Sequence, residues 1–137
     1  MKTVNPYFLN ELLSPITGLT DDDEAVILYQ NMNLNDEAQY RKIIKDLFKP
    51  HFNGISEIVQ QKSKLALSYY LSKDNYDFEG VFESCLPPFD PPKNPRDFFV
   101  WLWEELFGNE DYKISDVESF KEVPDVHEPN RPVKNYK

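Results

Sequence analysis

Helical spacing of apolar residues is the feature that most constrains how this chain can fold. Six segments carry large apolar side chains three and four residues apart, which places those side chains on one face of a helix. Proline or glycine follows most of these segments and is expected to stop them. The predicted helices are residues 5–13, 20–32, 35–48, 53–73, 78–86 and 94–107, with the fourth beginning at Asn53 or Ser56.

Residues at the ends of these segments support the helix assignment. Asn5 and Thr20 can each accept a hydrogen bond from the free amides of a first helical turn. Pro50 is expected to end the third helix, because proline has no N–H to donate. For the same reason residues 87–92, Pro-Pro-Phe-Asp-Pro-Pro, are expected to form a stiff extended connector.

Strand patterns are weak in comparison. Alternation of apolar and polar residues is scarce, and four glycines are few for a β protein. A chain of 137 residues suits one domain with one core. We therefore expect an all-α protein, with about six irregularly packed helices in a single domain, residues 1–121, and a loosely ordered, extended C-terminal tail, residues 122–137.

The net charge of the chain limits the kinds of molecule that we expect it to bind. The chain has 24 acidic and 15 basic residues, which gives a formal net charge of −9. An acidic surface repels phosphate backbones and anionic lipids, so we expect no direct contact with nucleic acid and none with a membrane. A basic protein would be attracted to such a surface, although net charge also serves simply to keep a protein soluble.

Cysteine content and the N-terminal sequence point to the cytoplasm. Cys85 is the single cysteine, so an internal disulfide and a thiolate metal cluster are excluded. The first residues lack the apolar run of a signal peptide, and no window approaches the ~20 apolar residues of a membrane span.

The charges are unevenly distributed along the chain. Residues 1–40 hold seven acids and one base, residues 41–75 three acids and seven bases, and residues 76–137 fourteen acids and seven bases. A basic strip therefore lies within an acidic protein, and its simplest use is to complement acidic residues of neighbouring helices. Lys62, within the apolar stripe of its helix, can extend outward or pair with a buried acid.

The predicted helix 94–107 carries two tryptophans that face opposite ways. At about 100° per residue, one arc holds an ordinary core face, made of Phe98, Phe99, Leu102, Trp103 and Leu106. Trp101 falls on the other side, at the spacing that brings it beside Asp97, Glu104 and Glu105. Its ring could pack under the 87–92 connector or the C-terminal tail, anchor a partner protein, or line a small-molecule pocket.

Two further acidic clusters are candidate partner-binding sites. One is Asp21-Asp22-Asp23-Glu24, which also suits the start of a helix. The other is Glu110-Asp111 with Asp116 and Glu118, which also suits a solvated turn. The expected partner-binding residues are Asp21, Asp22, Asp23, Asp97, Trp101, Glu104, Glu105, Glu110 and Asp111.

The sequence contains no recognisable catalytic constellation. His51 lies at a helix junction, where a capping or surface role is expected, and His127 lies in the predicted tail. Neither a nucleophile elbow nor a glycine-rich phosphate loop is present. We therefore expect no enzyme activity, no cofactor and no bound metal.

These observations together favour an acidic module that binds a basic protein. In size, acidity and aromatic content, most of all in PPFDPPKNPRDFFVWLWEELFGNEDY, residues 87–112, the chain resembles immunity proteins of contact-dependent growth inhibition and related polymorphic-toxin systems. The resemblance implies a bacterial cytoplasmic protein that neutralises one cognate toxin, such as a nuclease, by occluding its basic surface. An alternative is a helical adaptor or regulatory protein that binds a peptide or helix in a groove.

Overall fold

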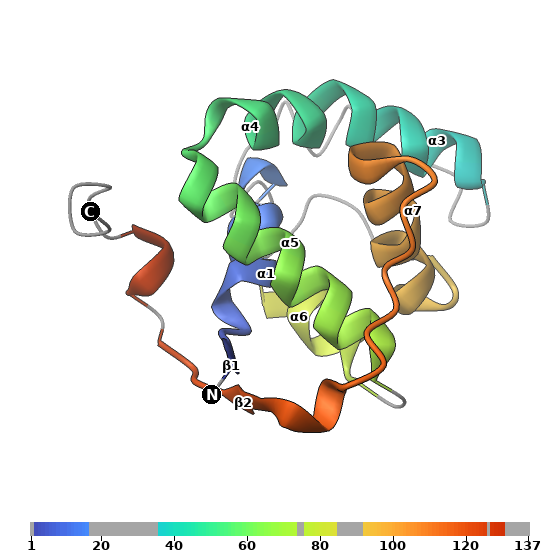
Figure 1. Ribbon diagram of the computed structural model, residues 1–137. Helices are drawn as coiled ribbons and strands as arrows, with labels where there is room; N and C mark the ends of the chain where they lie inside the picture. Colours follow the sequence, from blue (N-terminus) through green and yellow to red (C-terminus); the bar gives the residue numbers. More distant parts are fainter. Residues whose placement is uncertain (1, 17–35, 74–75, 85–91, 126, 131–137) are drawn as a thin grey trace.

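The computed structural model describes residues 2–16, 36–73, 76–84, 92–125 and 127–130. The helices are α1 (Tyr7–Leu12), α3 (Glu37–Ile43), α4 (Lys49–Gly54), α5 (Glu57–Ser72), α6 (Phe78–Ser84) and α7 (Pro95–Phe107). There are also two short strands, β1 (Lys2–Val4) and β2 (Phe120–Glu122). Four short helical turns are labelled η1 (Ser14–Ile16), η3 (Ile44–Phe48), η4 (Val117–Ser119) and η5 (Glu128–Asn130). In Figure 1 the α3–α4 segment runs across the top, α7 descends on the right, and α5 crosses in front of α1 and α6.

The mostly helical character predicted from the sequence is confirmed, but the helix count is lower. Because α3, η3 and α4 follow one another without a break, the described residues form five separate helices, where the sequence predicted about six in the whole chain. The predicted helix at residues 20–32 and the predicted connector at residues 87–91 lie outside the described residues.

The prediction that Pro50 ends the third helix is wrong. The helix runs on to Gly54 because the turn before the proline, η3, is wound as a π-helix. In this turn the Lys49 N–H donates to the carbonyl of Ile44, five residues back instead of four. A wider turn of this kind relieves the clash between a proline ring and the preceding turn, so the chain continues as helix after it.

The core is built on the aromatic face of α7. Phe98 is fully buried, and its ring lies 6.2 Å from Tyr40 of α3, 5.7 Å from Phe48 of η3 and 5.2 Å from Phe82 of α6, between centroids. All three contacts are edge-on, the geometry that aromatic quadrupoles favour. The predicted core face is confirmed at Phe98, Phe99, Leu102 and Trp103, which are all buried.

A small parallel sheet, absent from the all-α prediction, joins the two ends of the described chain. β1 pairs with β2 in the register Lys2 to Phe120, Thr3 to Lys121 and Val4 to Glu122. The Val123 N–H extends the pairing by donating to the carbonyl of Val4 at 2.8 Å. Strands of three residues are too short to show an alternating pattern, so only their contact in space reveals them.

Beyond α7 the chain runs round the outside of the helical body (Figure 1). We call residues 108–125 and 127–130 the C-terminal strap. The strap follows α5, where the hydroxyl of Ser72 accepts from the Ile114 N–H at 2.8 Å and donates to the carbonyl of Tyr112 at 3.2 Å. The sequence placed the end of the domain at residue 121; this boundary falls within β2, and residues 131–137 of the predicted tail lie outside the described residues.

Asn5 connects the far end of the strap to the body. Its side chain is 5% exposed, and its amide nitrogen donates to the carbonyl of Asp125 at 2.8 Å and to Glu128 Oε1 at 2.9 Å. Its amide oxygen accepts from the N–H of Asp125 at 3.3 Å and from the N–H of Tyr7 at 3.0 Å. One buried side chain thus satisfies both backbone groups of a strap residue and also starts α1, as the sequence predicted for Asn5.

Trp103→Ala should destabilise the protein by about 3–5 kcal/mol. The indole is 2% exposed, packs 4.4 Å from Phe107, and donates from Nε1 to the carbonyl of Glu110 at 2.6 Å. Urea denaturation followed by circular dichroism measures the loss. Tyr7→Ala, at a residue 36% exposed, is the control, and equal losses in the two variants would contradict the core assignment.

Stability should fall as the pH drops below the ordinary carboxyl range. Burial alone would raise the pKa of Glu122, but hydrogen bonds from Tyr70 at 2.7 Å and Lys73 at 3.0 Å outweigh it, and the pKa is lowered from its ordinary 4.5. A carboxylate with a lowered folded-state pKa stabilises the fold above its ordinary pKa, and this contribution is lost as the pH falls towards the folded value.

Urea midpoints at about pH 7 and about pH 3 measure this loss. Glu122→Gln should lose less stability over that interval than the parent. Glu79→Gln, at an exposed carboxylate of α6, should behave like the parent, and an unchanged pH dependence in Glu122→Gln would contradict the assignment.

Candidate functional site

Local sequence determines where α7 begins and ends, and so where its acidic side chains lie. Asn94 caps the helix by accepting from the Arg96 N–H at 3.2 Å, and Pro95 occupies the first turn, where no donor is needed. Gly108 ends the helix with φ at +65°, a conformation that side chains other than glycine rarely adopt. The chain therefore turns sharply after Phe107 and returns beside the end of its own helix.

This turn encloses an open hollow of about 590 Å³ at the C-terminal end of α7. The hollow is lined by Arg41, Trp103, Glu104, Gly108, Asn109, Glu110, Asp111 and Tyr112. Three of the predicted partner-binding residues, Glu104, Glu110 and Asp111, are thus brought together. With three acids against the single base Arg41, the lining has a formal charge of −2.

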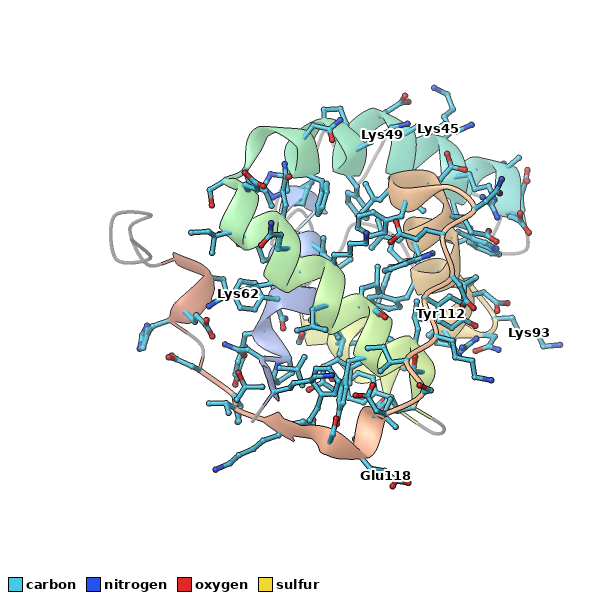
Figure 2. The ribbon with its side chains drawn as sticks, in the orientation of Figure 1. Lys45, Lys49, Lys62, Lys93, Tyr112 and Glu118 are labelled. Carbon is cyan, nitrogen blue, oxygen red and sulfur yellow. The ribbon has the colours of Figure 1, made fainter. Side chains whose placement is uncertain are left out.

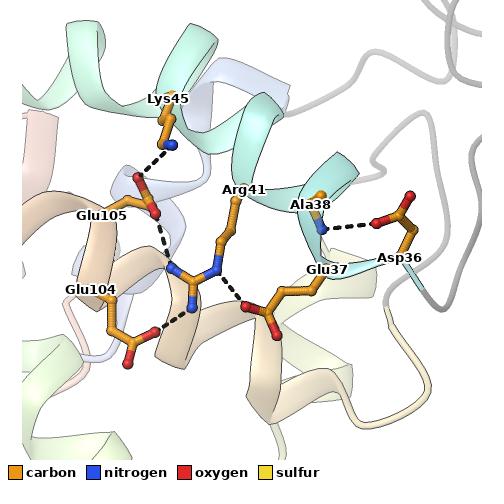
Figure 3. A network of polar contacts seen from close by, with 7 residues as sticks. All are labelled: Asp36, Glu37, Ala38, Arg41, Lys45, Glu104 and Glu105. Atoms are coloured by element: carbon orange, nitrogen blue, oxygen red, sulfur yellow. Dashed lines mark hydrogen bonds and ion pairs between the residues drawn. The ribbon is translucent and has the colours of Figure 1, made fainter.

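Arg41 of α3 holds the acidic end of α7 in place (Figure 3). Its guanidinium donates from Nε to Glu37 at 2.7 Å, from Nη1 to Glu105 at 2.9 Å, and from Nη2 to Glu104. Burial by itself would lower the pKa of Arg41, but the three carboxylates raise it, so the side chain stays charged. The sequence predicted that the basic strip would pair with acidic residues of neighbouring helices, and α3 and α7 are paired in this way.

The ion pairs of Arg41 also determine how far the carboxylates of Glu104 and Glu105 are exposed to solvent. The side chain of Glu105 is 14% exposed and also lies 3.7 Å from the ammonium of Lys45, so its charge is satisfied within the protein. The Glu104 side chain, 47% exposed, has one carboxylate oxygen on Arg41 and lines the hollow. Of this pair, only Glu104 is placed to meet a partner.

Trp101 lies away from the hollow. Its ring packs against Tyr40 of α3, with centroids 5.6 Å apart and planes tilted by 36°, and it is partly buried against the core. Packing on α3 was not among the three arrangements that the sequence suggested. Asp97, a turn earlier, is partly exposed and forms no ion pair with any residue the structure describes.

The remaining predicted site residues have different surroundings. Glu110, 53% exposed, pairs with Lys64 of α5 at 2.6 Å, while exposed Asp111 accepts from the Lys113 N–H at 2.9 Å. Asp111 has no ion pair among the described residues, so it carries the least compensated charge at the rim of the hollow. The cluster Asp21, Asp22 and Asp23 lies outside the described residues.

A second polar cluster, which the sequence did not reveal, joins α1 to α4. His51 Nε2 lies 2.9 Å from the hydroxyl of Ser14 and 3.5 Å from Oε1 of Glu11, and burial raises the pKa of Glu11. A catalytic triad needs the serine and the acid on opposite ring nitrogens, whereas both lie at Nε2 here. The cluster therefore has the geometry of a polar link between two helices.

Within the described ranges, no three histidine, cysteine or acidic side chains converge as a metal site would require. None of the helices in those ranges has the length and apolar character needed to cross a membrane. Comparisons with protein-family models, with curated proteins and with solved structures find no match to this chain.

Replacing Arg41 by glutamine should destabilise the protein by about 1–2 kcal/mol, because three partly desolvated carboxylates lose their shared cation. Chemical denaturation measures the loss. Lys42→Gln is the matched control, since this neighbouring lysine is 77% exposed and its ion pair with Asp46 lies along one helical segment. Similar stabilities of the two variants would show that the network around Arg41 does not support the fold.

Proposed function

We propose that this protein binds a basic segment of another protein in the hollow at the end of α7. The observation that carries the proposal is the convergence of Glu104, Glu110 and Asp111 on one open, net-negative cavity of about 590 Å³. The cavity lies within the range of about 300–1,000 Å³ typical of binding pockets, so it has room for a cationic side chain and its neighbours.

Charge and shape both favour an arginine- or lysine-bearing partner over a neutral one. Carboxylates accept paired hydrogen bonds from a guanidinium, and Tyr112 in the wall offers an aromatic surface for the aliphatic part of a long side chain. The negative charge of the whole chain would also speed the approach of a basic protein. Because Asp111 forms no ion pair with any described residue, a cation of the partner would not compete with one of this protein for its carboxylate.

The biological role that best suits such a module is toxin neutralisation. The chain resembles immunity proteins in size, acidity and aromatic content, and a nuclease toxin presents a basic groove that normally holds phosphates. Carboxylates around the hollow would occupy part of that groove and exclude nucleic acid. Trp101 is a weaker candidate anchor than the sequence suggested, because its ring packs on Tyr40.

The direct test pairs this protein with the product of the gene immediately upstream of its own. That product should arrest growth when expressed alone, growth should recover when this chain is co-expressed, and the two should form a stable complex in solution. Absence of both protection and complex formation would overturn the immunity role. Binding to several unrelated proteins, without protection, would favour an adaptor.

Within that complex, the double variant Glu110→Gln/Asp111→Asn should bind about tenfold more weakly, mostly through slower association. Both substitutions keep a carbonyl oxygen that can accept the existing hydrogen bonds. Glu79→Gln/Glu83→Gln is the matched control, because it removes the same charge from exposed positions of α6. Isothermal titration and stopped-flow mixing measure affinity and rate, and equal weakening in both double variants would show that only total charge matters.

A further inference from the structure

The outer part of the C-terminal strap is attached to the body mainly by polar contacts. We call residues 115–125 and 127–130 the distal strap. None of its side chains described by the structure is fully buried, and Val123 is 40% exposed. Val117 and Phe120 pack against the core but are only partly buried. Since burial of apolar surface is the main source of local stability, the distal strap is held less firmly than the helices beneath it.

Three ion pairs join the distal strap to the body at well-separated points. Asp116 pairs with Lys2 at 2.8 Å, Glu122 with Lys73 at 3.0 Å, and Glu128 with Lys62. Figure 2 shows Lys62 beside the turn η5, while Glu118 points away from the body. All three lysines belong to the body, and all three acids to the strap.

The inner part of the strap has an exposed ion pair with α5, between Glu110 and Lys64, but most of its contacts with the body are neutral hydrogen bonds. The carbonyl of Tyr112 accepts from the hydroxyls of Ser68 and Ser72, and the Ile114 N–H donates to Ser72. The Tyr112 hydroxyl also accepts from Arg96 at 3.1 Å. These hydrogen bonds are partly buried and, apart from that of Arg96, join neutral groups, so salt in solution affects them little.

A cavity of about 240 Å³ separates the distal strap from the body. Val123 and Glu128 of the strap line one side, and Val4, Phe8 and Leu65 of the body line the other. Packing at this boundary is therefore incomplete, in contrast to the closely packed rings around Phe98. Moving the distal strap away from the body breaks the hydrogen bonds of Asn5, the β1–β2 pairing, the tilted ring contact of Phe120 with Tyr69 and the three ion pairs.

We propose that the distal strap is an electrostatic latch that opens as a unit, hinged at Ser115, while the helical body stays folded. Opening uncovers the ring of Phe8 and the face of Tyr69, and it leaves the hollow intact because Glu110 and Asp111 precede the hinge. The latch depends on the contacts of the strap alone and is independent of the proposed function.

Amide hydrogen exchange by NMR tests the latch. The Val123 and Asp125 amides, which donate to Val4 and Asn5, report on the distal strap, and the Ile114 amide reports on its inner part. Between about 0.01 M and about 1 M NaCl the screening length falls from about 30 Å to about 3 Å. Exchange at Val123 and Asp125 should rise about tenfold over that range, while Ile114 and the amides within α5 stay unchanged.

A lysine variant separates the latch from general effects of salt. In Lys62→Gln/Lys73→Gln, exchange at Val123 should already be fast at low salt and should depend less on NaCl. Lys42→Gln/Lys49→Gln, at exposed lysines of the α3–α4 segment, should behave like the parent. Salt-independent exchange at Val123 in the parent would overturn the proposal, as would acceleration of Val123 and the α5 amides by the same factor.

Discussion

The fold depends on the burial of the aromatic face of α7. Phe98 contacts rings from α3, η3 and α6, while Trp103 on the same face reaches the loop that follows the helix. Aromatic side chains bury more area per residue than aliphatic ones, and edge-on contacts add directional preference. The position of α7 therefore also determines where its acidic side chains emerge, and the hollow exists because Gly108 turns the chain back beside this helix.

Many of the basic side chains of residues 41–75 form ion pairs with acidic side chains from other elements. The basic strip formed by residues 41–75 is compensated by acids from the C-terminal half: Arg41 by Glu104 and Glu105, and Lys62, Lys64 and Lys73 by Glu128, Glu110 and Glu122. Each exposed pair contributes little stability, but the pairs of Lys62, Lys64 and Lys73 join the strap to α5 and the residue after it at three points. Among the described residues, the exposed acids outside these ion pairs include Asp111 at the hollow, Glu118 of the strap, and Glu79 and Glu83 of α6.

For α7, the sequence predicted the helix and its core face correctly but not the surroundings of its outer face. The apolar face of α7 followed from its spacing, and the start at Asn94 and the end at Gly108 followed from local chemistry. The surroundings of Trp101 did not, because the side of α7 that α3 covers depends on how the two helices pack. For the candidate site, Glu104, Glu110 and Asp111 were identified by charge, but their convergence, and the withdrawal of Glu105 onto Arg41, required the fold.

By itself, the sequence determined the helical character, the core face of α7 and the acidic surplus, because periodicity, capping and charge are encoded within a few neighbouring residues. Tertiary structure alone decided that the chain continues as helix through Pro50, that β1 pairs with β2, and that Asn5 connects the strap to α1. These features join residues distant in the chain or depend on a wider turn that local propensity does not signal. Their free energy arises only once the helical body has brought the partners together.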